Sequence, residues 1–285
     1  MSRRRRQASV MDAPRCPMLL RASIGSVLVA CGLPFSAAAQ GTTVPSDSLL
    51  AGITARGRLL AAYDQAAWHA TDALLALRPD SAVVRAANTM IATLQPDGRW
   101  TVRFGRLTPA SDTFYVAYEA LPTARPDSFA IQPHAPPLPL VGPERLPATA
   151  LQVALRDFGA HQRPYNSYVL PRADGTFWVY FMPAQTDPAA LPHGADIRYL
   201  MAADASRIVD KHPMHRTLLN LALPENAVSG LHTVVVDDVP QDSDVFLVLA
   251  RHPRRPEMIG TEHYDYAIAI DGSITWRVGE RHSHR

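Results

Sequence analysis

The fold is decided by residues 165–182, YNSYVLPRADGTFWVYFM, and by residues 197–213, IRYLMAADASRIVDKHP. In the first segment Phe177, Val179 and Phe181 occupy alternate positions, so they share one face of an extended chain. A period of two among aromatic and β-branched residues is typical of strands, and PRADG supplies a turn between two of them. The two segments therefore predict an antiparallel sheet at the centre of the fold.

Two helices are predicted upstream of this sheet. Apolar residues recur every seven positions from Ile53 to Leu74, which predicts one apolar stripe on a helix over residues 48–77. Pro79 pushes the residue before it out of helical geometry and ends this helix. A second helix is predicted over residues 81–94, so the two should form an antiparallel helical hairpin.

Further elements are predicted outside these segments. Residues 185–194, QTDPAALPHG, are read as an irregular loop suited to border a site, and residues 148–158 as a third helix. Residues 214–223 fit either a helix or a strand. A two-residue hairpin turn is predicted at Asp271-Gly272. Alternation predicts strands over residues 100–104, 114–118, 232–236, 245–251, 264–270 and 274–278.

The predicted fold class is α+β. The N-terminal helical hairpin and one further helix should pack on a mainly antiparallel, curved β-sheet of about seven to nine strands, enough to split into two sheets. Residues 121–147 contain eight prolines, which limit regular structure to short edges and predict an extended connector. This connector would divide a region over residues 40–120 from a β-rich region over residues 148–285. The alternative is one continuous domain over residues 46–280.

The N-terminus has the pattern of an export signal. Residues 1–39 contain a basic leader, a short apolar run and small residues at Ala37 and Ala39, which predicts signal-peptide cleavage after Ala39. The apolar run is shorter than the ~20 residues that span a bilayer, so we expect no membrane-spanning helix in the mature chain. Residues 28–31, LVAC, resemble the lipobox of bacterial lipoproteins, in which Cys31 would carry a lipid anchor.

The leader also holds the positive charge and the cysteines. Removing its six arginines and one acid leaves 22 basic and 25 acidic residues, a net charge of −3, which argues against nucleic-acid binding. Because Cys16 and Cys31 both lie in the leader, the mature chain has no disulfide, thiol nucleophile or cysteine metal ligand. Translation can start at Met1, Met11 or Met18.

Histidines provide the main candidates for a metal site. His212 and His215 lie three residues apart, and His232 or Asp237 could supply a third ligand for zinc. However, the zinc-protease motif is absent, and Pro213 breaks the helix that such a pair would need. The favoured interpretation is therefore a turn that leaves a strand, with solvated or hydrogen-bonded histidines.

Carboxylates gather in residues 234–246, VVVDDVPQDSDVF, where oxygen ligands could bind calcium. The order of an EF-hand loop is absent, so a solvated loop between two strands is favoured. The sequence also contains no nucleophile elbow, dinucleotide-binding glycine motif or phosphate-binding loop. No cofactor is therefore predicted, with zinc or calcium as the weaker alternatives.

Two functions follow from these patterns. The favoured one is an exported bacterial protein, in the periplasm or outside the cell, that binds a ligand or partner without catalysis. It rests on clear strand patterning together with missing catalytic motifs. The alternative is a metal-assisted hydrolase that uses the histidine cluster. The sequence leaves open whether the chain is an enzyme and which partner it binds.

Overall fold

Four α-helices and fourteen strands form the described part of the computed structural model, which covers residues 44–188, 190–222 and 226–279. The predicted signal peptide, the anchor at Cys31 and the C-terminal tail lie outside these residues. The strands pair mainly antiparallel, so the α+β class is confirmed. In the described ranges, every helix is too short or too polar to cross a bilayer.

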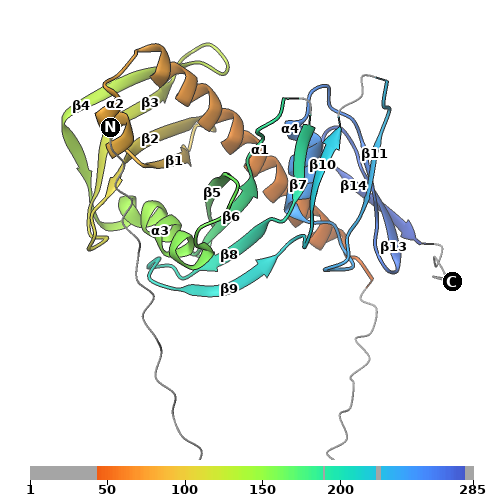
Figure 1. Cartoon of the computed structure of the whole chain (residues 1–285). Helices are drawn as coiled ribbons and strands as arrows, with labels where there is room; N and C mark the ends of the chain where they lie inside the picture. The colour runs from red at the N-terminus through yellow and green to blue at the C-terminus, as the bar shows by residue number, and fades with distance from the viewer. Residues whose placement is uncertain (1–43, 189, 223–225, 280–285) are drawn as a thin grey trace, which may run out of the picture. The chain divides into compact units, whose positions relative to one another are not determined.

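Sheet A lies at the N-terminal side of the chain and is antiparallel throughout (Figure 1). Its strands, in the order β1-β2-β3-β4, span Thr89–Leu94, Trp100–Leu107, Phe114–Pro122 and Phe129–Leu140. The proline-rich segment supplies β4, a twelve-residue strand that is longer than the short edges expected. Because β4 pairs only with β3 among the described strands, its prolines need no backbone donor on the outer side.

Sheet B is the central antiparallel sheet that the sequence predicts. Its strands, in the order β5-β6-β8-β9, span Tyr165–Pro171, Phe177–Pro183, Ile197–Met201 and Ile208–Pro213. On one face Val179 and Phe181 pack with α3, Leu146–Phe158, where the rings of Phe181 and Phe158 stack 4.3 Å apart. On the other face Tyr180 packs with residues of α1. Both faces are therefore buried, which explains why both sets of alternating residues are apolar.

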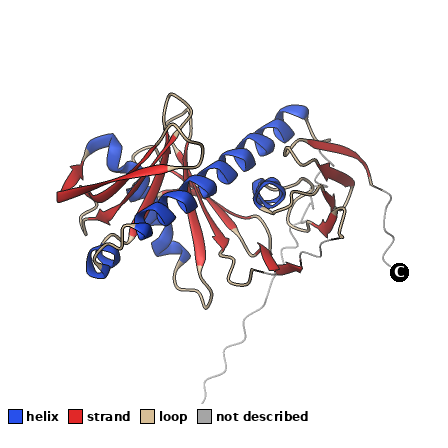
Figure 2. Cartoon of the chain, turned by 90° about the horizontal axis from the view of Figure 1, so that it is seen from above, coloured by secondary structure: helices blue, strands red, loops and turns tan. Residues whose placement is uncertain are grey.

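Helix α1, Asp47–Ala76, begins at Ser46, whose hydroxyl caps the backbone of Leu49. It contacts sheets A and B and then α4, and Figure 2 shows it lying across their strands. The predicted second helix is wrong beyond Ala86, because α2 spans only Ser81–Ala86 and residues 89–94 form β1. Pairing of β1 with β2 overrides the weak helical period there.

Sheets C and D form the rest of the fold. Sheet C pairs β7, Ala190–Gly194, with β10, Leu218–Ala222, so part of the predicted loop is a strand. Sheet D has the order β11-β12-β13-β14, and β11 runs parallel to β12. Its strands span Gly230–Thr233, Glu257–Gly260, Tyr264–Ile268 and Ile274–Val278. The predicted hairpin at Asp271-Gly272 is present and joins the last two strands, but its loop is longer than the two-residue turn expected, because the N–H of Ala269 donates to the carbonyl of Ser273 at 2.9 Å.

The strand predicted over residues 245–251 is wrong, because residues 242–250 form helix α4, Asp242–Ala250. The predicted solvated loop is wrong as well, since Asp242 and Asp244 are both 0% exposed. In a short apolar run the spacing of apolar residues does not distinguish a buried helix from a buried strand. Helix α4 is buried on most sides, so its sequence lacks the alternation of apolar and polar faces that marks a surface helix. Gly57 of α1 lets α4 approach, since a Cβ there would lie 2.4 Å from Cβ of Val245.

Candidate metal centre

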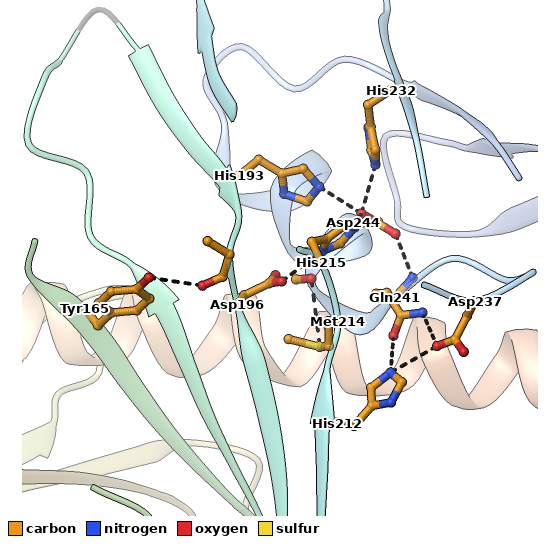
Figure 3. Close-up of polar contacts among 12 residues, drawn as sticks. Tyr165, His193, Asp196, His212, Met214, His215, His232, Asp237, Gln241 and Asp244 are labelled. Atoms are coloured by element: carbon orange, nitrogen blue, oxygen red, sulfur yellow. Dashed lines mark hydrogen bonds and ion pairs between the residues drawn. The ribbon is translucent and has the colours of Figure 1, made fainter. Parts of the chain in front are cut away.

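Three histidine side chains converge on one carboxylate where β7, the β9–β10 connection, β11 and α4 meet (Figure 3). The Nε2 atom lies 2.9 Å from Asp244 Oδ1 in His193, and 3.1 Å from it in both His215 and His232. All four side chains are buried. The potential ligand atoms lie within 4.8 Å of one another, so one ion can contact all four.

The distances from the imidazoles to Asp244 can be compared with those in a tetrahedral zinc site. A zinc–nitrogen distance of about 2.0–2.1 Å places neighbouring ligand atoms about 3.3–3.4 Å apart. The three distances to Asp244 Oδ1, 2.9, 3.1 and 3.1 Å, are slightly shorter. The four ligand atoms spread over as much as 4.8 Å, so the imidazole nitrogens would have to move closer to one another, and Asp244 Oδ1 slightly away from them, to hold the ion.

Protein groups alone leave part of the cluster unsatisfied. The Nε2 atoms of His193 and His215 are buried and form no hydrogen bond within the described residues. A carboxylate oxygen has two lone pairs, so Asp244 Oδ1 cannot accept from three imidazoles at once. Two buried nitrogen atoms that face Asp244 Oδ1 without a well-formed hydrogen bond are compatible with a cation site.

Two further carboxylates orient the imidazole rings. Asp196 Oδ1 lies 2.9 Å from Nδ1 of His215, and Glu257 Oε1 lies 2.9 Å from Nδ1 of His232. Arg251 holds Glu257 in turn through a contact of 2.7 Å. A carboxylate at Nδ1 keeps the proton on that nitrogen and frees the Nε2 lone pair, as is usual for histidine ligands of metals.

Gly230 makes room for one of these carboxylates. A Cβ at Gly230 would lie 1.9 Å from Oε2 of Glu257, which is closer than any real contact. Gly230 and Glu257 are paired residues of the parallel strands β11 and β12. The glycine therefore allows Glu257 to pass over β11 and reach His232.

Asp244 has a second role at the start of α4. Its Oδ2 atom accepts the backbone N–H of Gln241 at 2.6 Å, as an acidic residue in the first turn of a helix does. The two oxygen atoms of one carboxylate thus cap the helix and face the histidines. This arrangement fixes Asp244 Oδ1 relative to the backbone.

The formal charges of the cluster favour a divalent cation. Asp244, Asp196 and Glu257 carry three negative charges, and Arg251 carries one positive charge, which leaves a net charge of −2 when the histidines are neutral. These groups are almost fully buried, where an uncompensated charge is costly. One divalent ion would bring the net charge to zero.

The pKa values respond to the same imbalance. Burial opposes protonation of His215 and His232, but their carboxylate neighbours outweigh it and raise the pKa to about 10 and about 9, respectively. Burial likewise opposes ionisation of Asp244, but the three histidines hold its pKa well below its usual range. Two protons on the imidazoles thus take the place of a divalent charge.

A separate ionic network lies two residues away. Asp242, also on α4, accepts from Arg56 Nε at 2.9 Å, from Arg198 Nη1 at 2.6 Å and from the Tyr180 hydroxyl at 2.9 Å. These partners come from α1, β8 and β6. Asp242 therefore ties α4 to sheet B and to α1, next to the metal centre.

The structure brings together only some of the residues that the sequence suggested. His215 and His232 lie in the cluster, whereas His212 contacts Asp237 at 3.0 Å and Gln241 at 3.1 Å in a separate group (Figure 3). His212 lies in β9, whereas His215 follows Pro213, where this strand ends, so the two side chains point to different places.

Sequence reasoning missed His193, and it considered Asp244 only within residues 234–246 as a calcium ligand, not together with the histidines. His193 is a single histidine in a segment that resembled a loop, and it carries no local signal. Asp244 lies in a run rich in carboxylates, but its capping box with Gln241 appears only in the structure. The four ligands span residues 193–244, so no short motif contains them.

Comparisons of the chain with family models, with curated proteins and with solved structures return no match. These comparisons therefore name no function for the centre.

Proposed function

We propose that this chain is an exported, non-catalytic protein that binds one zinc ion in a closed four-ligand site. The single observation that carries the proposal is the convergence of three buried Nε2 atoms at 2.9–3.1 Å from one aspartate oxygen. The proposed ligands are His193, His215, His232 and Asp244.

The donor set favours zinc over calcium. Three imidazole nitrogens and one carboxylate oxygen in a compact arrangement suit a tetrahedral, borderline-soft ion. Calcium takes about six to eight oxygen ligands, which this cluster does not offer. Copper(II) also binds imidazole, but it prefers a square-planar arrangement.

Four protein ligands favour a structural role over metal-assisted hydrolysis. Catalytic zinc sites usually have three protein ligands and a water molecule in the fourth position. In this centre Asp244 would fill that position, and its other oxygen is engaged in the helix cap. The ion would instead join β7, the β9–β10 connection, β11 and α4, and its binding energy would contribute to folding.

The N-terminal sequence supports export of this zinc protein. We propose cleavage after Ala39, which gives a mature chain that begins at Gln40 and has no cysteine. Histidine and aspartate ligands do not form disulfides, so the centre is compatible with an oxidising compartment. Mass spectrometry of protein recovered from the producing cells tests this step, and a lipidated N-terminus at Cys31 would replace the soluble form by an anchored one.

The metal proposal is tested by titrating chelator-treated mature protein with zinc chloride in a calorimeter. We expect one zinc ion per chain for the wild type and at least a hundredfold weaker binding for His232→Ala. The matched control is His212→Ala, which removes an imidazole close by that points elsewhere. It should leave stoichiometry and affinity unchanged.

Two results would contradict the proposal. One is a wild-type protein that takes up no zinc after it has been shown to be folded by circular dichroism. The other is an equal loss of affinity in His212→Ala and His232→Ala, which would place the ion among the wrong histidines.

A further inference from the structure

A pocket of about 290 Å³ lies beside the metal centre, between α1, α4 and the strands β5 to β7. This volume is close to the lower limit for small-molecule sites. His193 lines one side of the pocket, and Asp64 and Trp68 of α1 line another. Since Asp64 and Trp68 are four residues apart on one helix, their side chains lie on the same face.

The pocket wall contains two carboxylates, Asp64 and Asp196, and two imidazoles, His193 and His252, but no lysine or arginine of the described residues. Asp196 already faces His215, whereas Asp64 accepts only the Tyr168 hydroxyl, at 2.8 Å, and forms no ion pair in the described part of the chain. Burial raises the pKa of Asp64, although the hydrogen bond from Tyr168 opposes this effect. Asp64 is thus a partly buried carboxylate without a counter-ion among the described residues.

Three of the other lining residues, Trp68, Asn166 and Gln185, can contact a cationic nitrogen, although the Trp68 ring also stacks on His69 with centroids 4.9 Å apart. Trp68 is 51% exposed although it is large and aromatic, and its indole face attracts cations more strongly than other aromatic rings do. The side-chain amides of Asn166 and Gln185 also line the pocket and can accept N–H donors through their oxygen atoms.

We propose that this pocket binds a small organic molecule with a primary ammonium group. Asp64 is the counter-ion, Trp68 is the aromatic wall, and the amide oxygens of Asn166 and Gln185 accept the remaining N–H groups. The pocket borders the candidate metal centre and shares His193 with it, but the groups proposed to bind the ammonium are not among the four proposed metal ligands.

Calorimetric titration of the protein as purified with n-butylamine at pH 7.5 tests the proposal. The neutral analogue 1-butanol and the anion butyrate serve as comparison ligands. We expect saturable binding of butylamine at least tenfold tighter than that of 1-butanol, and no binding of butyrate. Asp64→Asn should weaken the binding of butylamine at least tenfold, and Trp68→Ala should weaken it about two- to fivefold.

The matched control is Asp72→Asn, which removes the same charge from an exposed position of the same helix and should leave binding unchanged. Asp64→Asn keeps the oxygen that accepts from Tyr168, so this variant should fold, and thermal unfolding together with the zinc content checks it.

Three outcomes overturn the proposal. Butylamine binding that is no tighter than that of butanol removes the role of the charge. Equal losses of butylamine affinity in Asp64→Asn and Asp72→Asn would show that only the net charge of the chain attracts the ligand. If glucose binds more tightly than butylamine, and Trp68→Ala abolishes that binding, the pocket recognises hydroxyl groups instead.

Discussion

Sheet B and the candidate metal centre are held together by different forces. Sheet B buries apolar side chains on both faces, and Val179 and Tyr199 are fully buried there. In the metal centre the buried side chains are charged, and each depends on a partner, as Asp244 does on His193. Apolar packing tolerates small shifts, whereas a buried charge without its partner is strongly destabilising.

The comparison teaches that stability in the two regions should respond to different conditions. Apolar burial is insensitive to chelators and to pH, because it involves neither ions nor protons. A buried cluster of net negative charge requires a metal ion or protons to balance it. Perturbations of charge should therefore affect α4 and β11 before they affect sheet B.

Removal of zinc should produce the largest effect. Free zinc at 10⁴ times its dissociation constant should stabilise the folded chain by about 5.5 kcal/mol relative to chelator-treated protein. Hydrogen exchange followed by mass spectrometry should show protection lost first in α4 and β11, and later in β6. An equal and simultaneous loss in all three would remove the distinction between the two regions.

The substitution Asp242→Ala should have the next largest effect on stability. It leaves Arg56 and Arg198 without their carboxylate, and breaking a buried ionic network typically costs about 3–5 kcal/mol. The control Arg277→Ala removes an exposed pair with Asp265 and should cost less than about 1 kcal/mol. Urea unfolding measures the free energy of unfolding of both variants. Similar losses of stability in the two would contradict the role of Asp242.

Substitution Gly57→Ala tests the contact between α1 and α4. The added Cβ would lie 2.4 Å from Val245 Cβ and 2.8 Å from the Asp242 carbonyl oxygen. The two helices would therefore have to move apart, which should lower the free energy of unfolding by about 1–3 kcal/mol. Gly52→Ala, on the same helix, meets only the flexible Arg56 guanidinium at 3.2 Å and should stabilise by about 0.5–1 kcal/mol. Thermal unfolding should show opposite signs, and two changes of the same sign would refute the close approach.

The pair formed by His212 and Asp237 should give the smallest effect. The hydrogen bond to Asp237 raises the pKa of His212 above 6.5 although burial opposes it, and the same contact lowers the pKa of Asp237 below 3.8. The histidine contribution is complete below pH 6.5 and is lost as pH rises through the raised pKa. The aspartate contribution is present above pH 3.8 and is lost as pH falls through the lowered pKa.

Urea unfolding of the wild type and His212→Gln across pH measures this contribution. The wild type should be more stable by less than about 1 kcal/mol, because the pair is partly exposed and screened. The difference should be greatest between about pH 4 and pH 6.5. A difference that stays constant up to pH 9 would show that the charge of His212 does not matter.

Several elements were predictable because their signals are local. The period of α1, the alternation of β6 and the Asp271-Gly272 turn each involve contiguous residues, and each is confirmed. Helix α4 was predicted as a strand because its burial on most sides removes the period. Strand β1 was predicted as a helix because its partner β2, and not its own sequence, determines its conformation.

The sequence by itself determined the central sheet, the long first helix, the turns and the α+β class, since these follow from side-chain periods within short segments. Only the tertiary structure decided which histidines meet. His193, His232 and Asp244 come from elements far apart in the chain, and their convergence depends on how β7, β11 and α4 pack. A local pattern cannot encode such a meeting point, because each ligand is positioned by contacts with segments that lie elsewhere in the sequence.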